Sequence, residues 1–382
     1  MLRGRHLSVL CGSASAAITL RCLMNPTLGR SEPSPHPRRP RGKPKMFVRD
    51  PGIITSIFTR SVYSHDSDAF TRKWNKFTTN RLEKLVVIAD FDYSLTPAYK
   101  PTGLLFVSIL VLECCLLSNL VCLSLSFYKG EQALSTHGLL MTCKALGPRL
   151  ASLGRQIFEK YYPIEQSATL TNDEKLPFMI EWWTATHALF IERGISKRDI
   201  RDAVEASDLV LRDGFFETFE LLARANVPTL IFSAGLYDVI HAVLDKEYAK
   251  TRTKTPPPNV HVISNIMRFD EKEKAVDFEG TLIHSLNKNA TAVIGTEFWK
   301  KCQLEKRCNI LLLGDSLSDC NMTNGLEFTE DDILRIGFLN EDADKKLDLY
   351  LQHFDVVLTN DSTLWPVELL LHQLEQGKGS SD

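Results

Sequence analysis

The sequence predicts an α/β protein with a doubly wound parallel sheet. Short apolar runs have the length and continuous hydrophobicity of buried parallel strands. These strands are expected at Leu85–Ala89, Thr229–Phe232, Val260–Ile263, Ile310–Leu313 and Val356–Leu358. Segments with helical periodicity separate most of them, at Gly214–Arg224, Asp238–Lys250, Lys345–His353 and Thr363–Leu374. Strands that alternate with helices favour a single sheet covered on both faces.

A helical region interrupts this alternation. The sequence between Gly138 and Leu211 is mostly helical, and Pro177 suits the first turn of a helix that continues through Glu181–Trp183. The sequence therefore predicts a sheet domain that is interrupted after its first strand by a helical module and then resumed.

Composition and charge restrict the class of protein. The chain has 382 residues, of which 44% are hydrophobic and 24% charged. These values are ordinary for globular domains and exclude wholesale disorder, collagen and coiled coil. The net charge of −2 hides an asymmetry, because residues 1–45 carry about +8 and residues 46–382 about −10. We do not expect so acidic a body to bind a nucleic acid polymer, whereas small charged substrates and metals remain open.

The nine cysteines predict neither a disulfide scaffold nor a zinc site. Their number is odd and no C-x-x-C pair occurs. Several lie in two atypical segments, and we expect the others to be reduced thiols: Cys143, Cys302, Cys308 and Cys320.

The first atypical segment is residues 1–45, which are rich in Arg and Ser, contain only Glu32 as an acid and do not predict a packed core. Their composition is typical of an organelle transit peptide. The alternative is a disordered extension or translated upstream sequence, with Met46 as the working start.

The second atypical segment is Leu104–Phe127, which is 24 residues long with Glu113 as its one charge. This length is enough to span a bilayer. The rival interpretations are a buried core helix and an insertion foreign to the fold, since its Leu/Val/Ser/Cys/Phe bias is that of translated non-coding sequence.

Polar motifs follow the ends of the predicted strands. Asp90-Phe91-Asp92 follows the first, Ser233-Ala234-Gly235 the second and Gly314-Asp315-Ser316 the fourth, with Asn287-Lys288 between the last two. Ligands of open α/β sheets bind beyond the carboxyl ends of the strands, so we expect one shared site. Asp-x-Asp occurs elsewhere in the chain, but only Asp90 follows a buried strand.

These residue types suit the hydrolysis of a phosphate monoester. Asp90 can attack phosphorus and form an acyl phosphate, while Asp92 can protonate the leaving oxygen and then deprotonate water. Asp90 and Asp315, with water and a main-chain carbonyl, offer the oxygen ligands that Mg²⁺ prefers. Ser233 and the N–H groups near Ala234 and Gly235 can hold phosphate oxygens, and Lys288 supplies positive charge.

This constellation resembles the haloacid dehalogenase superfamily of phosphatases, and within it the cytosolic 5′-nucleotidase III (pyrimidine 5′-nucleotidase) family. The resemblance covers about residues 80–375. It is carried by Glu181-Trp182-Trp183-Thr184, Phe232-Ser233-Ala234-Gly235, Val262-Ile263-Ser264-Asn265, His284-Ser285-Leu286-Asn287-Lys288 and Leu313-Gly314-Asp315-Ser316. It implies a Rossmann-like core with a helical cap inserted after the first strand, and Mg²⁺-dependent hydrolysis of nucleoside 5′-monophosphates.

The resemblance also implies roles for single residues. Asp90 is the nucleophile and Asp92 the acid/base. The implied phosphate ligands are Ser233, Ala234, Gly235 and Lys288, and the implied metal ligands are Asp90, Asp92 and Asp315. Asp319 is expected to support the metal or the lysine from behind, and Glu181 on the cap to meet the base. His137 matches a family segment, and we interpret it as structural.

Three residues depart from the family pattern, one of them Pro97, where a basic residue is more usual. Ser94 stands where the family has Thr, which keeps a hydroxyl. Ser318 stands where it has Gly, and a positive φ there would strain the turn and displace Asp319.

The chain is expected to divide into six segments in order. Residues 1–45 form the extension, 46–100 begin the catalytic core, 101–129 are the apolar insertion, 130–212 form the cap, 213–376 complete the core and 377–382 are a flexible tail. A membrane-spanning Leu104–Phe127 would separate Asp90 from Lys288, so spanning and a working site exclude each other. We therefore favour retained non-coding sequence or an isoform-specific insertion over a lipid-contacting cap hairpin.

The expected protein is a monomeric cytoplasmic enzyme without membrane contact, although residues 1–45 leave organelle targeting open. Its expected substrates are pyrimidine nucleotides such as UMP and CMP, with 7-methylguanosine monophosphate left open. One alternative is a phosphatase of the same superfamily that acts on phosphoserine or a sugar phosphate. Another is an inactive product disabled by residues 102–128.

Overall fold

The computed structural model describes residues 62–64, 67–100, 130–143, 146–167, 169–289, 292–301 and 306–377. The predicted extension 1–45, the insertion 101–129 and residues 378–382 of the predicted tail lie outside the described residues. Within the described ranges, none of the helices combines the length and hydropathy that crossing a bilayer requires. The described cysteines that were predicted to be thiols are free: Cys143, Cys308 and Cys320.

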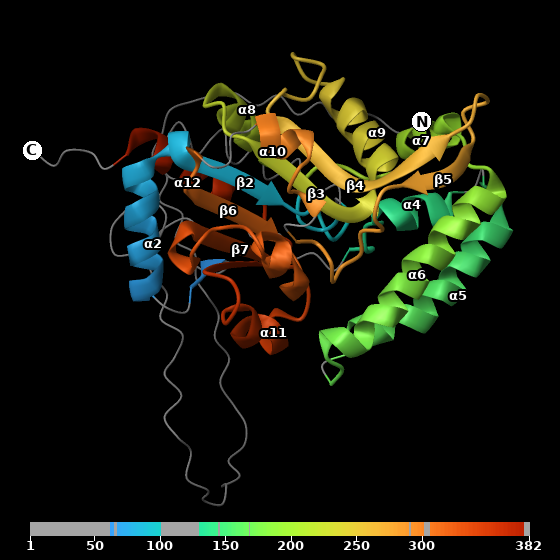
Figure 1. Cartoon of the computed structure of the whole chain (residues 1–382), viewed down its shortest axis with the longest axis horizontal. Helices are drawn as coiled ribbons and strands as arrows, with labels where there is room; N and C mark the ends of the chain where they lie inside the picture. The colour runs from blue at the N-terminus through green and yellow to red at the C-terminus, as the bar shows by residue number, and fades with distance from the viewer. Residues whose placement is uncertain are drawn as a thin grey trace, which may run out of the picture. The chain divides into compact units, whose positions relative to one another are not determined.

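The described residues form one eight-stranded sheet in the order β1-β8-β7-β6-β2-β3-β4-β5 (Figure 1). The strands are β1 (Val62–Tyr63), β2 (Leu85–Ala89), β3 (Thr229–Leu236), β4 (Val260–Phe269), β5 (Ala275–Glu279), β6 (Asn309–Gly314), β7 (Ile333–Leu339) and β8 (Val356–Thr359). Neighbouring strands from β8 to β4 pair in parallel, and only β1 and β5 at the two edges pair antiparallel. The chain therefore winds outward in both directions from β2, as a doubly wound sheet does.

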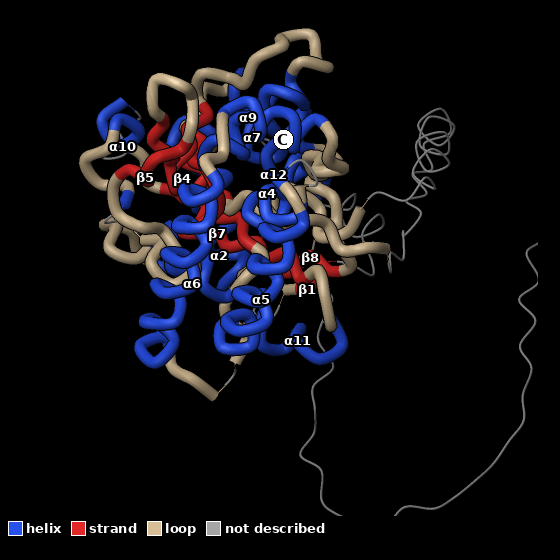
Figure 2. The backbone as a smooth tube through the Cα atoms, turned by 90° about the vertical axis from the view of Figure 1, so that its right-hand side faces the viewer, coloured by secondary structure: helices blue, strands red, loops and turns tan. Residues whose placement is uncertain are grey.

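Helices cover both faces of the sheet because the central strands are apolar on both (Figure 2). Along β2, Leu85, Val87 and Ala89 join one buried cluster, whereas Val86 and Ile88 join another. The first cluster includes side chains of α2 (Ser67–Asn80), α8 (Phe215–Arg224), α9 (Tyr237–Tyr248) and α12 (Trp365–Gln376). The second includes side chains of α10 (Glu297–Lys301) and α11 (Ala343–Tyr350). The short 3₁₀ helices are η1 (Leu82–Lys84), η5 (Leu317–Thr323) and η6 (Glu330–Asp332).

The helical insertion is confirmed between β2 and β3. It contains α4 (Thr136–Thr142), α5 (Pro148–Glu165), α6 (Asn172–Arg193) and α7 (Lys197–Glu205). Helices α5 and α6 lie side by side at one end of the sheet (Figure 1). We call the insertion the cap.

The expected start of a helix at Pro177 is wrong. Helix α6 begins at Asn172, because Thr171 and Glu174 form a reciprocal capping box: the Glu174 carboxylate accepts from the Thr171 N–H at 2.8 Å, and the Thr171 hydroxyl accepts from the Glu174 N–H. Pro177 therefore lies inside the helix. The helix ends at Arg193 and is capped by Gly194, which adopts a φ of 58° that suits glycine.

Strand β7 was not predicted from the sequence, because Arg335 and Gly337 interrupt its apolar run. Arg335 is mostly buried in the strand and its guanidinium pairs with Glu330. Gly337 allows the ring of Phe354 to pack directly on the strand. Both interruptions are explained by side-chain contacts, those of Arg335 with Glu330 and of Gly337 with Phe354, which hydrophobic periodicity does not reveal.

Replacing Gly337 by alanine tests this packing. A Cβ atom at Gly337 would lie 2.6 Å from Cγ of the buried Phe354 ring. We expect Gly337→Ala to lower the free energy of unfolding by about 1–3 kcal/mol, measured by urea denaturation. In the matched variant Gly154→Ala, the new Cβ meets Sδ of Met141 at the same 2.6 Å. Because a methionine adapts and alanine favours a helix, this change should cost less than about 1 kcal/mol. Equal losses in both variants would contradict the assignment.

Candidate active site

Asp90 and Asp315, two of the predicted site residues, meet where the adjacent strands β2 and β6 end. Asp90 directly follows β2, and Asp315 directly follows β6. Ala89 pairs with Leu313 in the parallel ladder, and the Asp90 N–H donates to the Leu313 carbonyl at 2.9 Å. The register of adjacent strands therefore brings two residues together that are far apart in sequence.

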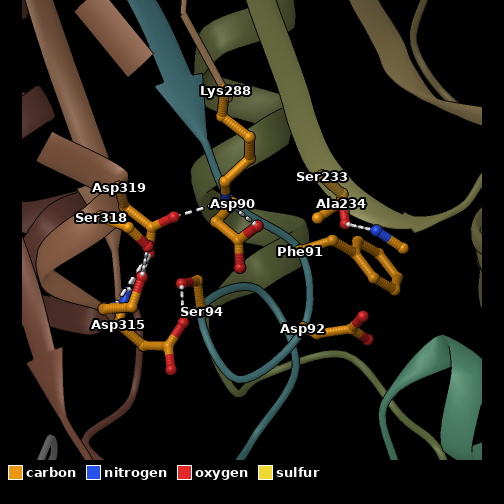
Figure 3. A network of polar contacts seen from close by, with 12 residues as sticks. Asp90, Phe91, Asp92, Ser94, Ser233, Ala234, Lys288, Asp315, Ser318 and Asp319 are labelled. Carbon is orange, nitrogen blue, oxygen red and sulfur yellow. Dashed lines mark hydrogen bonds and ion pairs between the residues drawn. The ribbon is translucent and has the colours of Figure 1, made fainter. Parts of the chain in front are cut away.

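Lys288 lies at the centre of the polar cluster (Figure 3). Its Nζ donates to Asp90 Oδ1 at 2.7 Å and also pairs with Asp319 Oδ1. Carboxylate oxygens of Asp90, Asp315 and Asp319 all lie within 4.8 Å of one another. We call these three residues the aspartate cluster.

The aspartate cluster concentrates negative charge in a poorly solvated place. Desolvation raises the pKa of Asp90 to about 7, and Asp319 adds to the rise while Lys288 opposes it. Desolvation, with repulsion from Asp319 and Asp90, also raises the pKa of Asp315 well above its usual range. Burial disfavours the charge on Lys288, but Asp319 and Asp90 outweigh it and raise the lysine pKa. Three carboxylates thus face one lysine, and oxygen donors of this kind fit a hard divalent cation.

The turn after β6 is held by Asp319. Its Oδ2 accepts from the N–H of Asp315 at 3.1 Å and of Ser316 at 2.9 Å. Gly314 is required beneath it, because a Cβ there would lie 2.4 Å from Cβ of Asp319. The sequence placed Asp319 behind the metal site, whereas the structure groups it directly with Asp90 and Asp315.

Ser318 fits this turn without the backbone strain that a positive φ would cause. It is not among the described residues that have a positive φ. Its hydroxyl lies 2.8 Å from the hydroxyl of Ser316. Ser94, another departure, donates from Oγ to Asp315 Oδ1 at 3.2 Å, so its hydroxyl serves the site.

Asp92 is directed away from the aspartate cluster (Figure 3). Its Oδ1 accepts from the Thr136 N–H and its Oδ2 from the Thr136 hydroxyl, both at 2.9 Å. Desolvation raises the pKa of Asp92 to about 6, and the two bonds from Thr136 limit the rise. Asp92 therefore lies outside the group of carboxylates that could hold a metal, and its partner is the first helix of the cap.

The Ser233-Ala234-Gly235 segment lies within β3, at a shift in the register between β3 and β4. The hydroxyl of Ser233 accepts from the Gly235 N–H at 3.0 Å. Gly235 permits close approach of the cap, because a Cβ there would lie 2.3 Å from the Thr136 hydroxyl. Trp183 of α6 donates from Nε1 to the Ala234 carbonyl at 2.9 Å, which ties the cap to this segment.

Asn265 joins the same segment to the loop that carries Lys288. Its amide donates to the carbonyls of Ala234 at 2.9 Å and Ile283 at 2.8 Å. Its Oδ1 accepts from the Ile283 N–H at 2.9 Å. The loop then continues through His284, whose N–H donates to Asn287 Oδ1 at 2.7 Å. Asn265 therefore sets the distance between the predicted phosphate ligands.

Two acids of the cap, Glu181 and Glu165, differ in their surroundings. Glu181 on α6 pairs with Lys160 at 3.0 Å, and 56% of its side chain is exposed. Glu165, at the end of α5, hydrogen-bonds to Ser285 and interacts electrostatically with Asp319. Desolvation raises the pKa of Glu165. Among the described acids of the cap, Glu165 thus interacts with the aspartate cluster through Asp319.

His137 behaves as the structural histidine that the sequence suggested. Its Nε2 lies 3.4 Å from Nε2 of His187, and the two rings stack. His187 stacks in turn on Phe278 of β5. Desolvation, with repulsion from His187, lowers the pKa of His137 well below its usual value. Desolvation also lowers the pKa of His187, to about 4, so both histidines are neutral packing groups between the cap and the β4–β5 hairpin.

Sequence reasoning missed Thr136, Asn265 and Glu165. Thr136 follows Ser135, which caps α4, so an N-cap signal marked the segment but not its contact with Asp92. Asn265 belonged to a recognised motif without a role of its own. Glu165 carried no signal, because an acid at the end of a helix is ordinary on a solvated surface.

Fold and site together define a phosphatase of the haloacid dehalogenase class, with an aspartate after the first central strand, a buried lysine and an acidic turn after β6. The family model described as "Pyrimidine 5'-nucleotidase (UMPH-1)" matches residues 121–375. The chain belongs to this family and is a 5′-nucleotidase. Asp90 and Asp92 precede the matched residues, so their assignment depends on the structure.

Individual proteins show the same likeness. The 7-methylguanosine phosphate-specific 5′-nucleotidase of Mus musculus is 36% identical over 251 residues, which are 65% of this chain and 81% of that protein. The 7-methylguanosine phosphate-specific 5′-nucleotidase A of Xenopus laevis is 31% identical over 304 residues, 80% of this chain and 92% of that protein. The crystal structure of cytosolic 5′-nucleotidase IIIB bound to cytidine is similar with a TM-score of 0.68 and 26% identity, covering 85% and 97% of the two chains.

Replacing Asp315 by asparagine tests the charge balance of the aspartate cluster. Because its pKa is raised on folding, ionisation of Asp315 destabilises the folded protein as the pH rises above about 3.9. With divalent metal removed by a chelator at pH 8, the Asp315→Asn variant should therefore have a higher melting temperature than the wild type. The difference between the two melting temperatures should shrink towards pH 5.

Adding Mg²⁺ gives the complementary measurement. Millimolar Mg²⁺ should raise the melting temperature of the wild type by about 2–4 °C and leave that of Asp315→Asn unchanged. A variant that is less stable than the wild type in chelator at every pH would contradict the charge argument.

Proposed function

We propose that this 5′-nucleotidase hydrolyses nucleoside 5′-monophosphates through a phospho-aspartate on Asp90. The observation that carries the proposal is the carboxylate of Asp90 at the end of β2, held by Lys288 and adjoining Asp315 and Asp319. A carboxylate so placed can attack a phosphoryl group, while the lysine offsets the negative charge of the phosphate.

The reaction proceeds in two steps whose atoms balance. A carboxylate oxygen of Asp90 bonds to phosphorus, the bond from phosphorus to O5′ breaks, and Asp92 transfers its proton to O5′ as the nucleoside leaves. Water then attacks phosphorus and gives a proton to Asp92, which releases inorganic phosphate and restores Asp90. A pKa of about 6 suits Asp92 to both transfers near neutral pH.

The aspartate cluster also supports a Mg²⁺ requirement. Asp90, Asp315 and Asp319 supply hard oxygen donors and more negative charge than Lys288 balances. The ion would supply positive charge that draws the phosphate and the nucleophile together. Asp92 was expected among the metal ligands, and the direction of its carboxylate towards Thr136 favours Asp319 in its place.

The phosphate ligands remain those expected from the sequence. Ser233 and the main chain of Ala234 and Gly235 lie on β3, next to the strand that Asp90 follows, and Lys288 contacts Asp90 directly. This arrangement supports binding of the phosphate between β2 and β3, on the side opposite Asp315.

The substrate class is proposed from the relatives and the cap. The description of the family indicates pyrimidine nucleotides as substrates. The names of the similar proteins indicate 7-methylguanosine monophosphate. We propose that one site accepts both kinds of nucleotide. The position of Glu165 near Ser285 and Asp319 supports it as the acid that meets the nucleoside. The role of Glu181 in base binding stays a prediction, as do the monomeric state and the cytoplasmic location.

Replacing the nucleophile tests the assignment. Asp90→Asn should lower phosphate release from UMP, CMP and 7-methylguanosine monophosphate by about 10⁴-fold or more, because no acyl phosphate forms. Asp344→Asn is a matched control, since it changes an exposed aspartate of another Asp-x-Asp pair. Phosphoserine and a sugar phosphate serve as competing substrates.

Two outcomes would count against the proposal. Turnover that survives in Asp90→Asn would refute the nucleophile, and faster turnover of phosphoserine than of any nucleotide would refute the substrate class. A wild type that is inactive, together with an active variant lacking residues 102–128, would identify the insertion as inhibitory.

The two cap acids are separated by a paired substitution. Glu165→Gln should raise the KM for nucleotides about tenfold, because a contact to the nucleoside is lost, and should leave hydrolysis of p-nitrophenyl phosphate unchanged. Glu181→Gln should have a smaller effect, since its side chain is exposed and paired with Lys160. The reverse order would assign the nucleoside contact to Glu181.

A further inference from the structure

The loop that follows β2 holds two side chains of the site in an unusual backbone conformation. It runs from Phe91 to Tyr99 and carries Asp92 and Ser94. Tyr93 within it has a φ of 66°, which a residue with a side chain seldom adopts. A backbone held in this region costs free energy and persists only where its surroundings over-determine it. The structure should therefore contain groups that impose this shape.

Arg212 is the group that contacts this loop most extensively. It lies between α7 and α8, where the chain returns from the cap to the core, and its side chain is 2% exposed. Its guanidinium donates to the carbonyls of Tyr93 at 2.6 Å, Ser94 at 2.8 Å and Thr96 at 3.0 Å. Its own N–H donates to the carbonyl of Leu95 at 2.8 Å.

A buried carboxylate completes the arrangement from the other side. Arg212 donates to Asp361 Oδ1 at 2.9 Å. Asp361 in turn accepts from the N–H of Ala98 at 2.9 Å and of Tyr99 at 3.1 Å. The pair thus binds carbonyl groups in the first half of the loop and N–H groups in the second half. The guanidinium also lies over the ring of Phe338, 4.5 Å from its centre.

The loop transmits this geometry to the aspartate cluster. Ser94, whose carbonyl Arg212 binds, donates from Oγ to Asp315 Oδ1 at 3.2 Å (Figure 3). Asp92 directly precedes Tyr93, whose carbonyl Arg212 also binds. The fork of N–H groups on an arginine can reach several carbonyls at once, whereas a lysine offers one ammonium group.

We infer that Arg212, with Asp361, is a positioning residue for the nucleotidase reaction, which holds Asp92 and Ser94 in register with Asp315. The inference rests on the proposed function of the site. Arg212 contacts the loop through main-chain carbonyls, so it acts on the reaction through the loop.

The test compares conservative variants at Arg212 and Asp361 with an arginine that has a similar bonding pattern elsewhere. Arg212→Lys keeps the charge and loses the fork, and Asp361→Asn keeps the shape and loses the charge. Arg307→Lys is the matched control. Arg307 also donates to main-chain carbonyls, those of Leu82, Leu85 and Asn226, but it does so at the opposite end of β2.

Three quantities are measured on the full chain: kcat and KM for UMP, CMP and 7-methylguanosine monophosphate, the affinity for Mg²⁺ alone by calorimetry, and the melting temperature. We expect Arg212→Lys and Asp361→Asn to lower kcat about 10²-fold with KM within threefold, because a displaced loop misplaces Asp92. Their Mg²⁺ affinity should fall about tenfold, because Ser94 no longer orients Asp315. Arg307→Lys should leave kcat and Mg²⁺ affinity unchanged, whatever its melting temperature.

The outcomes separate this inference from the proposed function. Folded Arg212→Lys and Asp361→Asn proteins with wild-type kcat and Mg²⁺ affinity would overturn it, as would the same kcat loss in Arg307→Lys. If Arg212→Lys does not fold, Asp361→Asn decides. If the wild type hydrolyses no nucleotide, the proposed function fails, and the Mg²⁺ titration alone decides whether Arg212 positions the site.

Discussion

Crowding of carboxylates around one buried lysine is the constraint on which the rest of this structure depends. Asp90, Asp315 and Asp319 approach one another within 4.8 Å, and Lys288 contacts two of them. Charges of one sign in a desolvated place oppose folding, as the raised pKa of Asp90 records. The apolar strands on both sides of β2 stabilise the sheet enough to hold the site in this unfavourable state.

Side chains outside the site keep its loops in place. Asn265 joins the Ser233-Ala234-Gly235 segment to the loop of Lys288, and Asp319 shapes the turn that presents Asp315. Thr136 holds Asp92 from the cap. Each uses hydrogen bonds to main-chain groups or a carboxylate, which fix direction as well as distance. A site built at strand ends needs such support, because loops have no regular hydrogen bonding of their own.

The cap also forms direct contacts with the segments that carry the site residues. Trp183 bonds to the Ala234 carbonyl, and Thr136 approaches Gly235 so closely that a side chain there would collide. The orientation of Asp92 is therefore linked to the position of the first cap helix. Arg212 lies where the cap rejoins the core and contacts the loop on the other side of Asp92. Thr136 in the cap and Arg212 on the return to the core thus contact Asp92 and the loop that carries it.

The amino-acid sequence alone was enough to predict the parallel sheet, the helical insertion and the order of the polar motifs. Continuous apolar runs and strand-end residues are local signals, and parallel strands bring such ends together. Three features of the site became clear only from the tertiary structure. Asp319 belongs to the aspartate cluster, and the carboxylate of Asp92 bonds to Thr136. On the cap, Glu165 interacts with Asp319, whereas Glu181 is exposed. Strand β7 was likewise decided by packing around Gly337, whereas the start of α6 is marked by the local Thr171–Glu174 capping box, a sequence signal that sequence reasoning missed. Side-chain direction depends on neighbours that are remote in sequence, and no local pattern records them.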